Sequence, residues 1–401
     1  MKIAQIEVVT LRHEYPSGKG FKFAGGYCNG RLSCLVFVHT EDGLTGVGSV
    51  YSHPGLVTSI IEEHLQPILL GRDPLQVEEI WDLCYRLTRW YGRKGAAVSA
   101  LGGIDTALWD IRGKAAGKPI SQLLGANRSK VPVYASALLW KDDPKELGEE
   151  AQRHLDFGFR GMKTRLGRNY DYDREAVAVV RKAIGSGNRL MVEGNARYSL
   201  AQAERIAAEY RAAGVFWFEE PFPPEQIDNF LALRPSVGIP LASGENEFGV
   251  QGFRELLDQG LVDIVQPDCS RSGGITECYR IGKMAGDRGI RVATHTWSDA
   301  VALVANMHLI AALPTGLTVE MDRTGNPFID ELLVEPLQVV DGEVAVPEGP
   351  GLGIELDRAA LERFRMPRLS TPPLGNYSDM VFGREHFNPA PAYETSEVGV
   401  G

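Results

Sequence analysis

The feature that most constrains the fold is a repeated unit between residues 131 and 322, in which an apolar, β-rich run is followed by a turn and an amphipathic helix. Apolar strands that alternate with helices are typical of a parallel sheet buried on both faces. Eight parallel strands close best as a barrel of the TIM type, so we predict an α/β barrel. The eight runs are residues 131–138, 161–166, 189–195, 215–220, 239–246, 262–268, 291–296 and 317–322.

The main alternative is an open, doubly wound sheet, which is built from the same kind of strands and helices. That fold normally carries Gly-x-Gly-x-x-Gly after its first strand to bind a phosphate. No strand–turn–helix unit of this sequence contains the motif. Helical patterns at 173–184, 200–213 and 275–288 separate the strands, and several begin with a capping residue or proline and end with glycine, which supports the barrel.

The first 128 residues differ from this repeat and indicate a separate α+β domain. They contain a meander of three strands with a turn at Glu41-Asp42-Gly43, followed by helices near residues 57–70, 77–91 and 96–116. A chain of 401 residues is longer than one compact domain usually needs, which also favours two domains. We predict an N-terminal α+β domain at 1–128 and a catalytic barrel at 129–330.

The segment after the barrel, residues 331–401, has a third pattern. Residues 332–346 are typical of a short strand pair and 358–365 of one helix, and we expect this segment to return to the first domain. From 367 to 401 the sequence is rich in proline, glycine and polar residues. This composition predicts an extended tail that is either mobile or used in subunit contact.

The charge of the chain excludes some classes of partner. Its formal net charge is −10 and its pI is about 5.4, so nothing favours nucleic acid or an anionic membrane. A small anionic substrate is still compatible, because a local metal and lysine can outweigh the global charge. No window approaches the roughly 18 apolar residues of a membrane span, and the N-terminus runs straight into a strand pattern. We expect a soluble, cytoplasmic protein.

The cysteines give no sign of a metal or disulfide framework. There are five, an odd number, and none is spaced two or three residues from another. Buried free thiols in a reducing compartment are therefore expected at Cys28, Cys34, Cys84, Cys269 and Cys278.

Three consecutive barrel strands end in a glutamate. Glu193, Glu219 and Glu245 occupy equivalent positions, one strand–helix unit apart. In a TIM barrel the functional side chains lie at the C-terminal strand ends, so these carboxylates should converge at the barrel mouth. Clustered carboxylates repel one another unless a cation neutralises them, and oxygen-only ligands select a hard ion. We predict one Mg²⁺ site, with Mn²⁺ as the alternative.

Each glutamate also has a simpler interpretation when it is taken alone. An acidic residue before a helix is favoured by the helix dipole whatever its function. Equal spacing on three consecutive apolar strands is not explained by that effect. The shared metal site is therefore the better interpretation of the set.

The remaining strand ends supply a histidine, two acids and two cations. Asp268 ends the sixth strand and His295 the seventh, and a carboxylate beside an imidazole fixes its tautomer and raises its basicity. A lone histidine would more often be a simple hydrogen-bonding residue, but the paired Asp268 favours a catalytic base. The eighth strand ends at Glu320. Lys163 and Arg165 alternate on the second strand, so both point the same way.

Together these groups indicate chemistry at the carbon beside a carboxylate. That C–H is a very weak acid, because removing its proton yields an enediolate dianion. A divalent metal and a lysine that bind the carboxylate oxygens stabilise the dianion where its charge develops. His295 can then take the proton.

This arrangement resembles the enolase superfamily, and a histidine on strand seven with an aspartate on strand six resembles its mandelate racemase subgroup. Residues 100–114, with Pro119 and 123–125, resemble the first family signature, and 190–198 the second. The resemblance covers almost the whole chain. It implies a capping domain, formed by both chain ends, over a (β/α)7β barrel. It also implies one Mg²⁺, a homo-oligomer and proton abstraction α to a carboxylate.

The resemblance also implies a role for each residue of the site. By position, the metal ligands are Glu193, Glu219 and Glu245, the carboxylate contact is Lys163, the base is His295 with Asp268, and Glu320 hydrogen-bonds the substrate carboxylate. Two positions depart from the common pattern. The first ligand is usually aspartate, and Glu193 is one methylene longer. The second cation is usually a lysine that can act as a base, whereas Arg165 cannot readily give up its proton.

The second departure favours elimination over racemisation. A racemase needs a base on each face of its substrate, whereas elimination needs only His295. We predict a lyase that dehydrates a sugar acid to a 2-keto-3-deoxy acid. Residues 321–328 and 349–353 resemble sugar-acid members, including galacturonate and galactarolactone cycloisomerases, so a cycloisomerase or epimerase is the alternative. A non-catalytic barrel would show broken ligands or a lost base, and only Glu193 and Arg165 point that way.

Candidate substrate contacts follow the strand ends and lie in two loops of the first domain. Residues 14–30 are rich in glycine, as a mobile lid over the mouth would be, and residues 51–55 form a second loop. Simple packing is the alternative for the side chains of these loops. The candidates are Phe23, Tyr27, His53, Trp297, Asn195 and Asn246, with Phe21 beside them in the lid.

Overall fold

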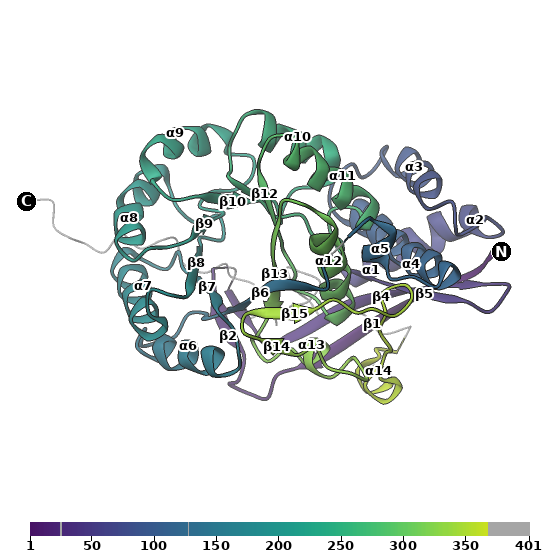
Figure 1. The fold of residues 1–401 in the computed structure, drawn as a ribbon, viewed down its shortest axis with the longest axis horizontal. Coiled ribbons are helices and arrows are strands. Elements are labelled where there is room, and N and C mark those ends of the chain that lie inside the picture. Colours follow the sequence, from purple (N-terminus) through teal and green to yellow (C-terminus); the bar gives the residue numbers. More distant parts are fainter. Residues whose placement is uncertain (25, 127, 368–401) are drawn as a thin grey trace, which may run out of the picture.

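The computed structural model of the protein describes residues 1–24, 26–126 and 128–367. It contains a closed β/α barrel and an α+β unit built mainly from the residues that precede the barrel, 3–123 (Figure 1). The predicted fold class is therefore confirmed, while the exact domain boundaries 1–128, 129–330 and 331–401 stay predictions.

Eight parallel strands form the barrel. Each strand pairs with its neighbour in the chain, and the last, β13, pairs with the first, β6, which closes the ring. The strands are β6 (Lys130–Ala137), β7 (Gly161–Arg165), β8 (Arg189–Glu193), β9 (Trp217–Glu219), β10 (Leu241–Ser243), β11 (Ile264–Val265), β12 (Arg291–Thr294) and β13 (Gly316–Asp322). Several are shorter than predicted, because the chain leaves extended geometry at the mouth: Glu220 and Gly244 have φ of 36° and 140°.

Seven helices surround the strands (Figure 1). Some begin with side-chain caps: Asn169 and Ser199 accept backbone hydrogen bonds, and Ser199 forms a capping box with Gln202. The last helix is buried on all sides, since it lies between the barrel and the N-terminal unit. The helices are α6 (Glu146–Asp156), α7 (Tyr170–Ile184), α8 (Leu200–Ala212), α9 (Ile227–Val237), α10 (Gly249–Asp258), α11 (Gly274–Gly286) and α12 (Ala300–Ala312).

The N-terminal unit is a three-stranded antiparallel sheet covered by helices. Strands β1 (Ile3–Glu14), β4 (Gly30–Thr40) and β5 (Thr45–Val50) form the predicted meander. A hairpin, β2 (Phe21–Phe23) and β3 (Gly26–Cys28), lies inside the segment that was predicted as a glycine-rich loop. The helices are α1 (Pro54–Ser59), the π-helix η1 (Ile60–Leu65), α2 (Gln66–Leu69), α3 (Val77–Thr88), α4 (Ala96–Ala116) and α5 (Ile120–Leu123).

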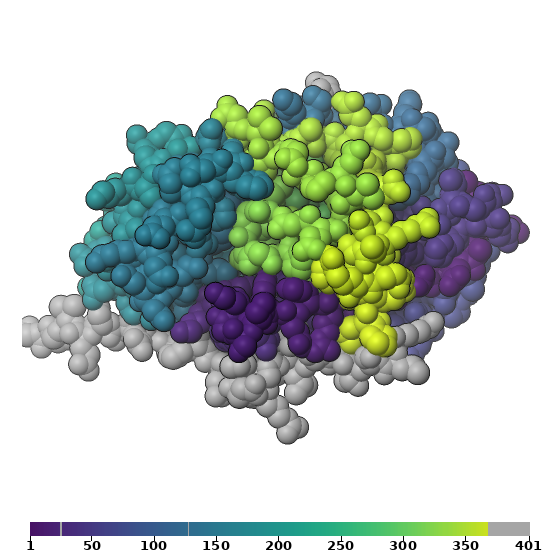
Figure 2. Space-filling model, turned by 90° about the horizontal axis from the view of Figure 1, so that it is seen from below, coloured from purple at the N-terminus to yellow at the C-terminus, as the bar shows by residue number. Residues whose placement is uncertain are grey.

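The described part of the C-terminal segment divides between the two units. After α13 (Pro327–Asp330), strand β14 (Val339–Val340) pairs with β15 (Glu343–Ala345), and β15 pairs antiparallel with β6 of the barrel. Helix α14 (Arg358–Phe364) instead packs against β1. In Figure 2 the yellow C-terminal residues accordingly lie beside the purple N-terminal residues. The predicted tail at 367–401 lies almost entirely outside the described residues.

A layer of side chains fills the barrel interior below the mouth. It consists of Tyr134, Met191, Trp217, Ala242, Ile264 and Ala293. Because alternate residues of a strand point to the same side, the residues two positions further along β8, β9 and β12 rise above this layer into the mouth. All five cysteines are buried. Within the described ranges, no helix combines the length and apolar character that crossing a membrane requires.

Candidate active site at the barrel mouth

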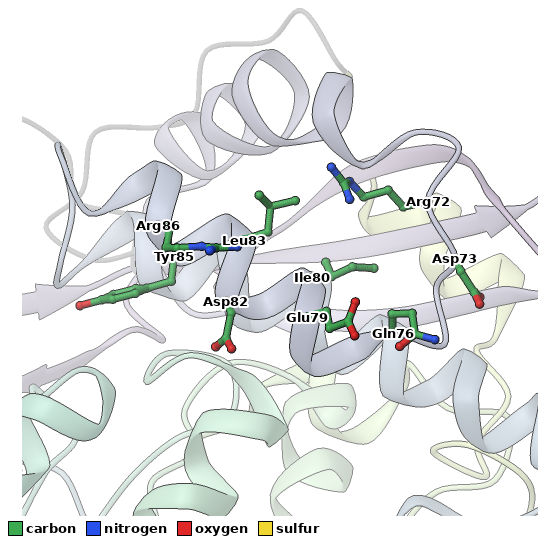
Figure 3. A pocket seen from close by; sticks show the side chains of 9 residues that line it. All are labelled: Arg72, Asp73, Gln76, Glu79, Ile80, Asp82, Leu83, Tyr85 and Arg86. Carbon is green, nitrogen blue, oxygen red and sulfur yellow. The ribbon is translucent and has the colours of Figure 1, made fainter.

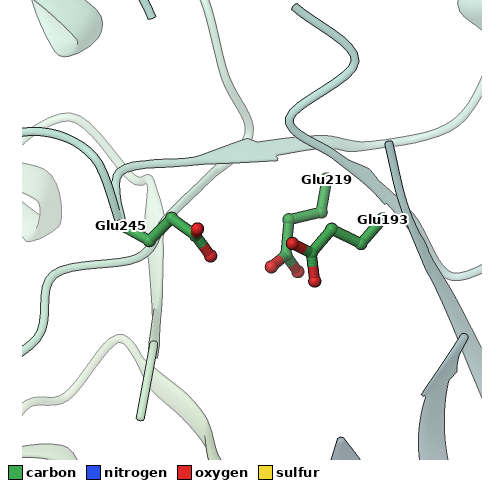
Figure 4. A group of neighbouring side chains, drawn as sticks. All are labelled: Glu193, Glu219 and Glu245. Carbon is green, nitrogen blue, oxygen red and sulfur yellow. The ribbon is translucent and has the colours of Figure 1, made fainter. Parts of the chain in front are cut away.

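The three predicted glutamates come together. Glu193 and Glu219 are the last residues of β8 and β9, and Glu245 lies two residues beyond β10. One carboxylate oxygen from each lies within 4.8 Å of the others. Figure 4 shows the three carboxyl groups directed toward the same space. Glu193 and Glu219 are fully buried, so their charges need partners.

The backbone turns sharply where these glutamates leave their strands. Asn195 and Glu220 have φ of 44° and 36°, which non-glycine residues rarely adopt. Such conformations cost free energy and persist where the surrounding structure fixes them. Here Asn195 donates a hydrogen bond to Glu193, and Glu220 accepts one from Asn246 at 2.7 Å.

Lys163 and Arg165 lie on β7 and contact the same carboxylates. The Lys163 ammonium forms ion pairs with Glu219, with Glu193 at 2.8 Å and with Glu320 at 2.9 Å. Arg165 Nη1 donates to Glu193 Oε1 at 2.6 Å. Both cations are buried. The predicted alternation of the two residues along the strand therefore brings both side chains to the mouth.

The pKa values of this cluster reflect burial and opposite charges acting together. Burial raises the pKa of Glu219 to about 7, although Lys163 acts to lower it. Burial acts in the same direction on Glu193, but Arg165 and Lys163 hold its pKa below the usual value. Burial lowers the pKa of Lys163, and the surrounding carboxylates more than offset this and keep it well above its usual value.

The donor set fits a hard divalent cation. Four carboxylates, from Glu193, Glu219, Glu245 and Glu320, face only two permanent cations, so negative charge is in excess. Glu245 Oε2 is buried and accepts no hydrogen bond from the described residues. An oxygen-only set in which one carboxylate oxygen accepts no hydrogen bond suits Mg²⁺ or Mn²⁺.

His295 and Asp268 form the predicted pair. His295 lies one residue beyond β12, and its Nδ1 is 2.8 Å from Asp268 Oδ2. Asp268 carries the negative charge, so Nδ1 bears the proton and Nε2 is the nitrogen that faces the carboxylates, 3.5 Å from Glu245 Oε2. Burial alone would lower the pKa of His295, but Glu245, the hydrogen bond to Asp268 and Glu320 raise it to about 9.

Glu320 lies within β13 rather than at its end, because the strand continues to Asp322. Its Oε2 accepts a hydrogen bond from the backbone N–H of Thr296 at 2.9 Å, beside His295. Burial acts to raise the pKa of Glu320, but Lys163, His295 and Arg165 lower it to about 2. The predicted run 317–322 ends with β13 at Asp322, and Glu320 lies in it two residues before that end, beside the other carboxylates of the mouth.

The candidate substrate contacts fall into two groups. Trp297 is buried, with the Arg165 guanidinium carbon 4.1 Å from its ring centre, and Asn195 and Asn246 hydrogen-bond to Glu193 and Glu245. The loop residues are different. Phe23 packs in a small apolar cluster with Ala24, Cys28 and Leu139; Tyr27 pairs with Lys22 in the hairpin; and His53 precedes α1.

Sequence reasoning missed several residues that support the site. Asn306 donates to Asp268 Oδ1 at 3.1 Å and to the His295 carbonyl at 3.0 Å. Tyr51 lies against His295, with ring centres 5.5 Å apart, and Arg31 forms an ion pair with Asp322. Asn306 had a signal, since it and His308 are the two polar residues in the stretch 300–312. Arg31 had none, because its partner is nearly three hundred residues away in the chain.

A hollow on the N-terminal unit lies apart from this site. Side chains from residues 72–86 line it, including Arg72, Asp82 and Arg86 (Figure 3). The lining mixes both signs of charge and includes none of the barrel-mouth residues. It does not extend the candidate active site.

Comparison with family models matches both units of the chain. Residues 146–360 match the model described as enolase C-terminal domain-like. Residues 5–125 match the mandelate racemase / muconate lactonizing enzyme N-terminal domain. The two matches together include the barrel strands from β7 onward and the three-stranded sheet.

The names of similar proteins give two kinds of reaction, cycloisomerisation and dehydration. The chain is 37% identical to D-galactarolactone cycloisomerase of Agrobacterium fabrum, over 92% of this chain and 100% of that protein. It is 32% identical to arabinonate dehydratase of Saccharolobus solfataricus, over 82% of this chain and 89% of that protein.

Solved structures with the same fold include two informative cases. The 3,6-anhydro-D-galactonate cycloisomerase from Zobellia galactanivorans has a TM-score of 0.85 at 34% identity, covering 92% of this chain and 100% of that one. A racemase from Streptomyces coelicolor A3(2) with bound magnesium has a TM-score of 0.84 at 27% identity, covering 91% and 100%.

Proposed function

The chain belongs to the mandelate racemase and muconate lactonizing enzyme family of the enolase superfamily, and from this we propose that it is a sugar-acid lyase. The reaction removes the proton α to the substrate carboxylate and expels the β-oxygen as water. The observation that carries this proposal is the pairing at the mouth: one oriented imidazole, and across from it an arginine rather than a second base.

Glu193, Glu219 and Glu245 would hold Mg²⁺, with Mn²⁺ as the alternative. When bound, the ion supplies positive charge to the substrate carboxylate as negative charge develops there. The Lys163 ammonium, buried at the same place, binds the same carboxylate, and Glu320 completes that end of the site. These groups are fixed before the reaction, so they stabilise the developing charge without reorganisation.

Glu245 is the main group that raises the pKa of His295, so a cation bound to Glu245 would favour the neutral imidazole. In that form His295 accepts the α-proton at Nε2. Its Nδ1–H is held by Asp268, which keeps the tautomer and stabilises the imidazolium that forms. The electron pair left by the proton expels the oxygen on the β-carbon. The imidazolium returns the proton to that oxygen, water leaves, and the enol product becomes a 2-keto-3-deoxy acid.

Arg165 is the reason to favour elimination over racemisation. Burial acts to lower its pKa, but Glu193 and the other carboxylates raise it further above an already high value. A guanidinium in this state neither gives up nor returns a proton, so it cannot serve as the base of the opposite face.

A second reaction has the same steps and differs only in its leaving group. In a cycloisomerase the expelled β-oxygen belongs to a lactone or anhydro ring, so it stays in the product and the mass does not change. The 37% identical relative that is covered over its full length bears this activity in its name. An epimerase is less consistent with Arg165.

The proposed function is tested by incubating the protein and Mg²⁺ with mono- and diacid sugars and their lactones in heavy water. Apart from the deuterium that the enol takes up from the medium, a keto acid that has lost the mass of one water supports dehydration. A keto acid or lactone isomer of otherwise unchanged mass supports cycloisomerisation. Deuterium uptake with inversion and no keto acid would overturn elimination, and no reaction with any compound would overturn catalysis.

The base has its own test in the same medium. His295→Asn should abolish exchange of the α-proton, because it removes the imidazole that Asp268 orients at the mouth. Asp268→Asn should lower the rate by about 100-fold or more while leaving the imidazole in place. Exchange that persists in His295→Asn would mean that the base lies elsewhere.

The cytoplasmic location and the homo-oligomeric state stay predictions. Cell fractionation tests the first, and light scattering of the purified protein tests the second. Neither affects the assignment of roles at the barrel mouth, because the acids, the histidine and the cations of the site all come from one chain.

A further inference from the structure

Trp297 lies between two buried arginines from different parts of the fold. The Arg165 guanidinium carbon is 4.1 Å from the centre of its ring, and that of Arg31 is 4.6 Å away. All three side chains are almost fully buried. Cations over an indole face are attracted to it, most strongly where water is excluded. Arg31 belongs to β4 of the N-terminal unit, whereas Arg165 belongs to β7 of the barrel.

Arg31 is itself held from the barrel side. Its Nη2 donates to Asp322 Oδ2 at 2.6 Å and to Thr324 Oγ1 at 2.5 Å. Asp322 also accepts from Asn326, and Asn326 donates to the carbonyl of Ser298, the residue after Trp297. One hydrogen-bonded network therefore fixes the backbone beside Trp297 as well as the guanidinium over its ring.

Three neighbouring groups hold the Arg165 guanidinium in place. Nη1 donates to Glu193 at 2.6 Å, Nη2 lies 3.5 Å from Ser136 Oγ, and the guanidinium plane rests on Trp297. Its Nε–H is buried and has no hydrogen-bond partner among the residues that the structure describes.

We propose that Arg31 and Trp297 are positioning residues that hold the Arg165 guanidinium so that it binds an oxygen of the anionic substrate. This inference rests on the proposed function for the substrate class. It assigns Trp297 an action through Arg165 rather than a contact with substrate. It also gives a physical reason for arginine at position 165: a planar guanidinium stacks on an indole and presents a fixed N–H, and a lysine does neither.

The test measures binding as well as turnover. The probe is tartronate, a small hydroxy-dicarboxylate whose two charges resemble the enediolate, titrated calorimetrically into the Mg²⁺-loaded protein. Trp297→Leu removes the aromatic face and should weaken tartronate binding about 10-fold, whereas Trp297→Phe keeps a face and should weaken it about 3-fold or less. Arg31→Lys, which keeps a cation for Asp322, should lie between them.

The decisive comparison repeats Trp297→Leu in an Arg165→Lys background. Because Trp297 acts through the guanidinium, Trp297→Leu should lower tartronate affinity less than about 2-fold once Arg165 is already lysine. An unchanged 10-fold loss in that background, or no loss in Trp297→Leu alone, would overturn the inference. Mg²⁺ affinity measured without tartronate and the melting temperature identify a variant that has merely lost structure.

The two proposals can fail separately. KM and kcat for the fastest sugar acid of the library should follow the same pattern, with the change mainly in KM. If no compound turns over while tartronate binding still depends on Trp297 through Arg165, the proposed reaction fails and the positioning role stands. If neither turnover nor tartronate binding is found, both are overturned.

Discussion

Glu193 and Arg165, the two residues that depart from the family pattern, contact each other. The longer side chain of Glu193 gives one oxygen to Arg165 and Asn195 and brings the other to within 2.8 Å of Lys163. An aspartate on the same backbone would end one methylene earlier. The two departures therefore form one altered interaction beside the metal ligands, and the charge of the ligand set is kept.

Glu219 offers the clearest prediction for the metal site. Glu219→Gln keeps the volume but removes one of the three ligand charges, so Mg²⁺ affinity measured by calorimetry should fall by more than about 100-fold, the upper range for residues that only support ligands. Glu220→Gln is the matched control one residue away. Glu220 is also buried, but it bonds to Ser243 and Asn246 and lies outside the ligand group.

The Glu220→Gln variant should bind Mg²⁺ within about 10-fold of the wild type. Equal losses in the two variants would show that net charge, not ligation by Glu219, determines binding. Unchanged affinity in Glu219→Gln would remove the metal site as described.

The sequence predicts the reactive residues better than the residues around them. Glu193, His295 and Asp268 were predictable because barrel strands end on one face, so equal spacing along the chain becomes proximity in space. Asn306 and Arg31 bind these residues or their neighbours through contacts between distant elements, and no periodic pattern records such contacts.

Among elements, α4 shows why the longest signature stretch of the sequence contains adjacent glycines, Gly102 and Gly103. A Cβ on Gly103 would lie 2.3 Å from Val50 Cγ2 on β5, and one on Gly102 would lie 2.7 Å from the Gly274 nitrogen. The helix therefore packs backbone to backbone against the N-terminal sheet and against the loop before α11. That loop begins at Cys269, directly after Asp268.

Gly102→Ala should destabilise the protein through this close contact. The added methyl must push back the 269–274 loop, and overpacking of this kind typically costs about 1–3 kcal/mol of unfolding free energy. Gly187→Ala is the control, since a Cβ there meets nothing within 4 Å, and its effect should stay within about 0.5 kcal/mol. Urea unfolding followed by circular dichroism measures both.

If Gly102→Ala and Gly187→Ala unfold at the same urea concentration, α4 does not depend on this contact. A drop in stability without change in the rate of α-proton exchange would mean that the loop shift stops short of Asp268.

Long periodic elements were predicted correctly, whereas short strands and their pairing were not. The ring of strands and α4 follow from hydrophobic period and length, and α4 begins and ends at the predicted residues. The β2–β3 hairpin was missed because its strands are only three residues each. The strand pair β14–β15 joins β6, because an edge of β6 below the mouth is available to it, and this pairing depends on the folded barrel rather than on any local pattern.

At the scale of the whole molecule, buried polar contacts join the two units. Asp299, the cap of α12, accepts hydrogen bonds from Ser33 and Ser49 of the N-terminal sheet. His308, on the same helix, accepts from the backbone N–H of Ser121 at 3.2 Å and donates to the Leu352 carbonyl at 3.0 Å. One helix of the barrel thus holds the N-terminal unit and the C-terminal segment.

His308 can make both bonds only as a neutral imidazole. Its Nδ1 must accept while Nε2 donates, and protonation of Nδ1 would set it against the N–H of Ser121. Burial lowers the pKa of His308 from 6.5 to about 4. In the unfolded chain the imidazole takes up a proton at the higher pH, so below pH 6.5 the unfolded state binds more protons and is favoured.

Acid should therefore separate wild type from His308→Gln, which keeps a neutral donor and acceptor but cannot be charged. Between pH 7 and 8 the difference in unfolding free energy between the two proteins should be constant. As the pH falls from about 6.5 to about 4, the wild type should lose up to about 3 kcal/mol relative to the variant, and below that range the difference should level off. Urea unfolding at each pH measures the unfolding free energy of both proteins. Taking the difference cancels the other buried acids that titrate in the same range, such as Asp105 and Asp173.

A difference that does not change with pH would show that His308 is charged or solvated in the folded protein. The junction of α12 with the N-terminal unit and the C-terminal segment would then not be the closed contact described.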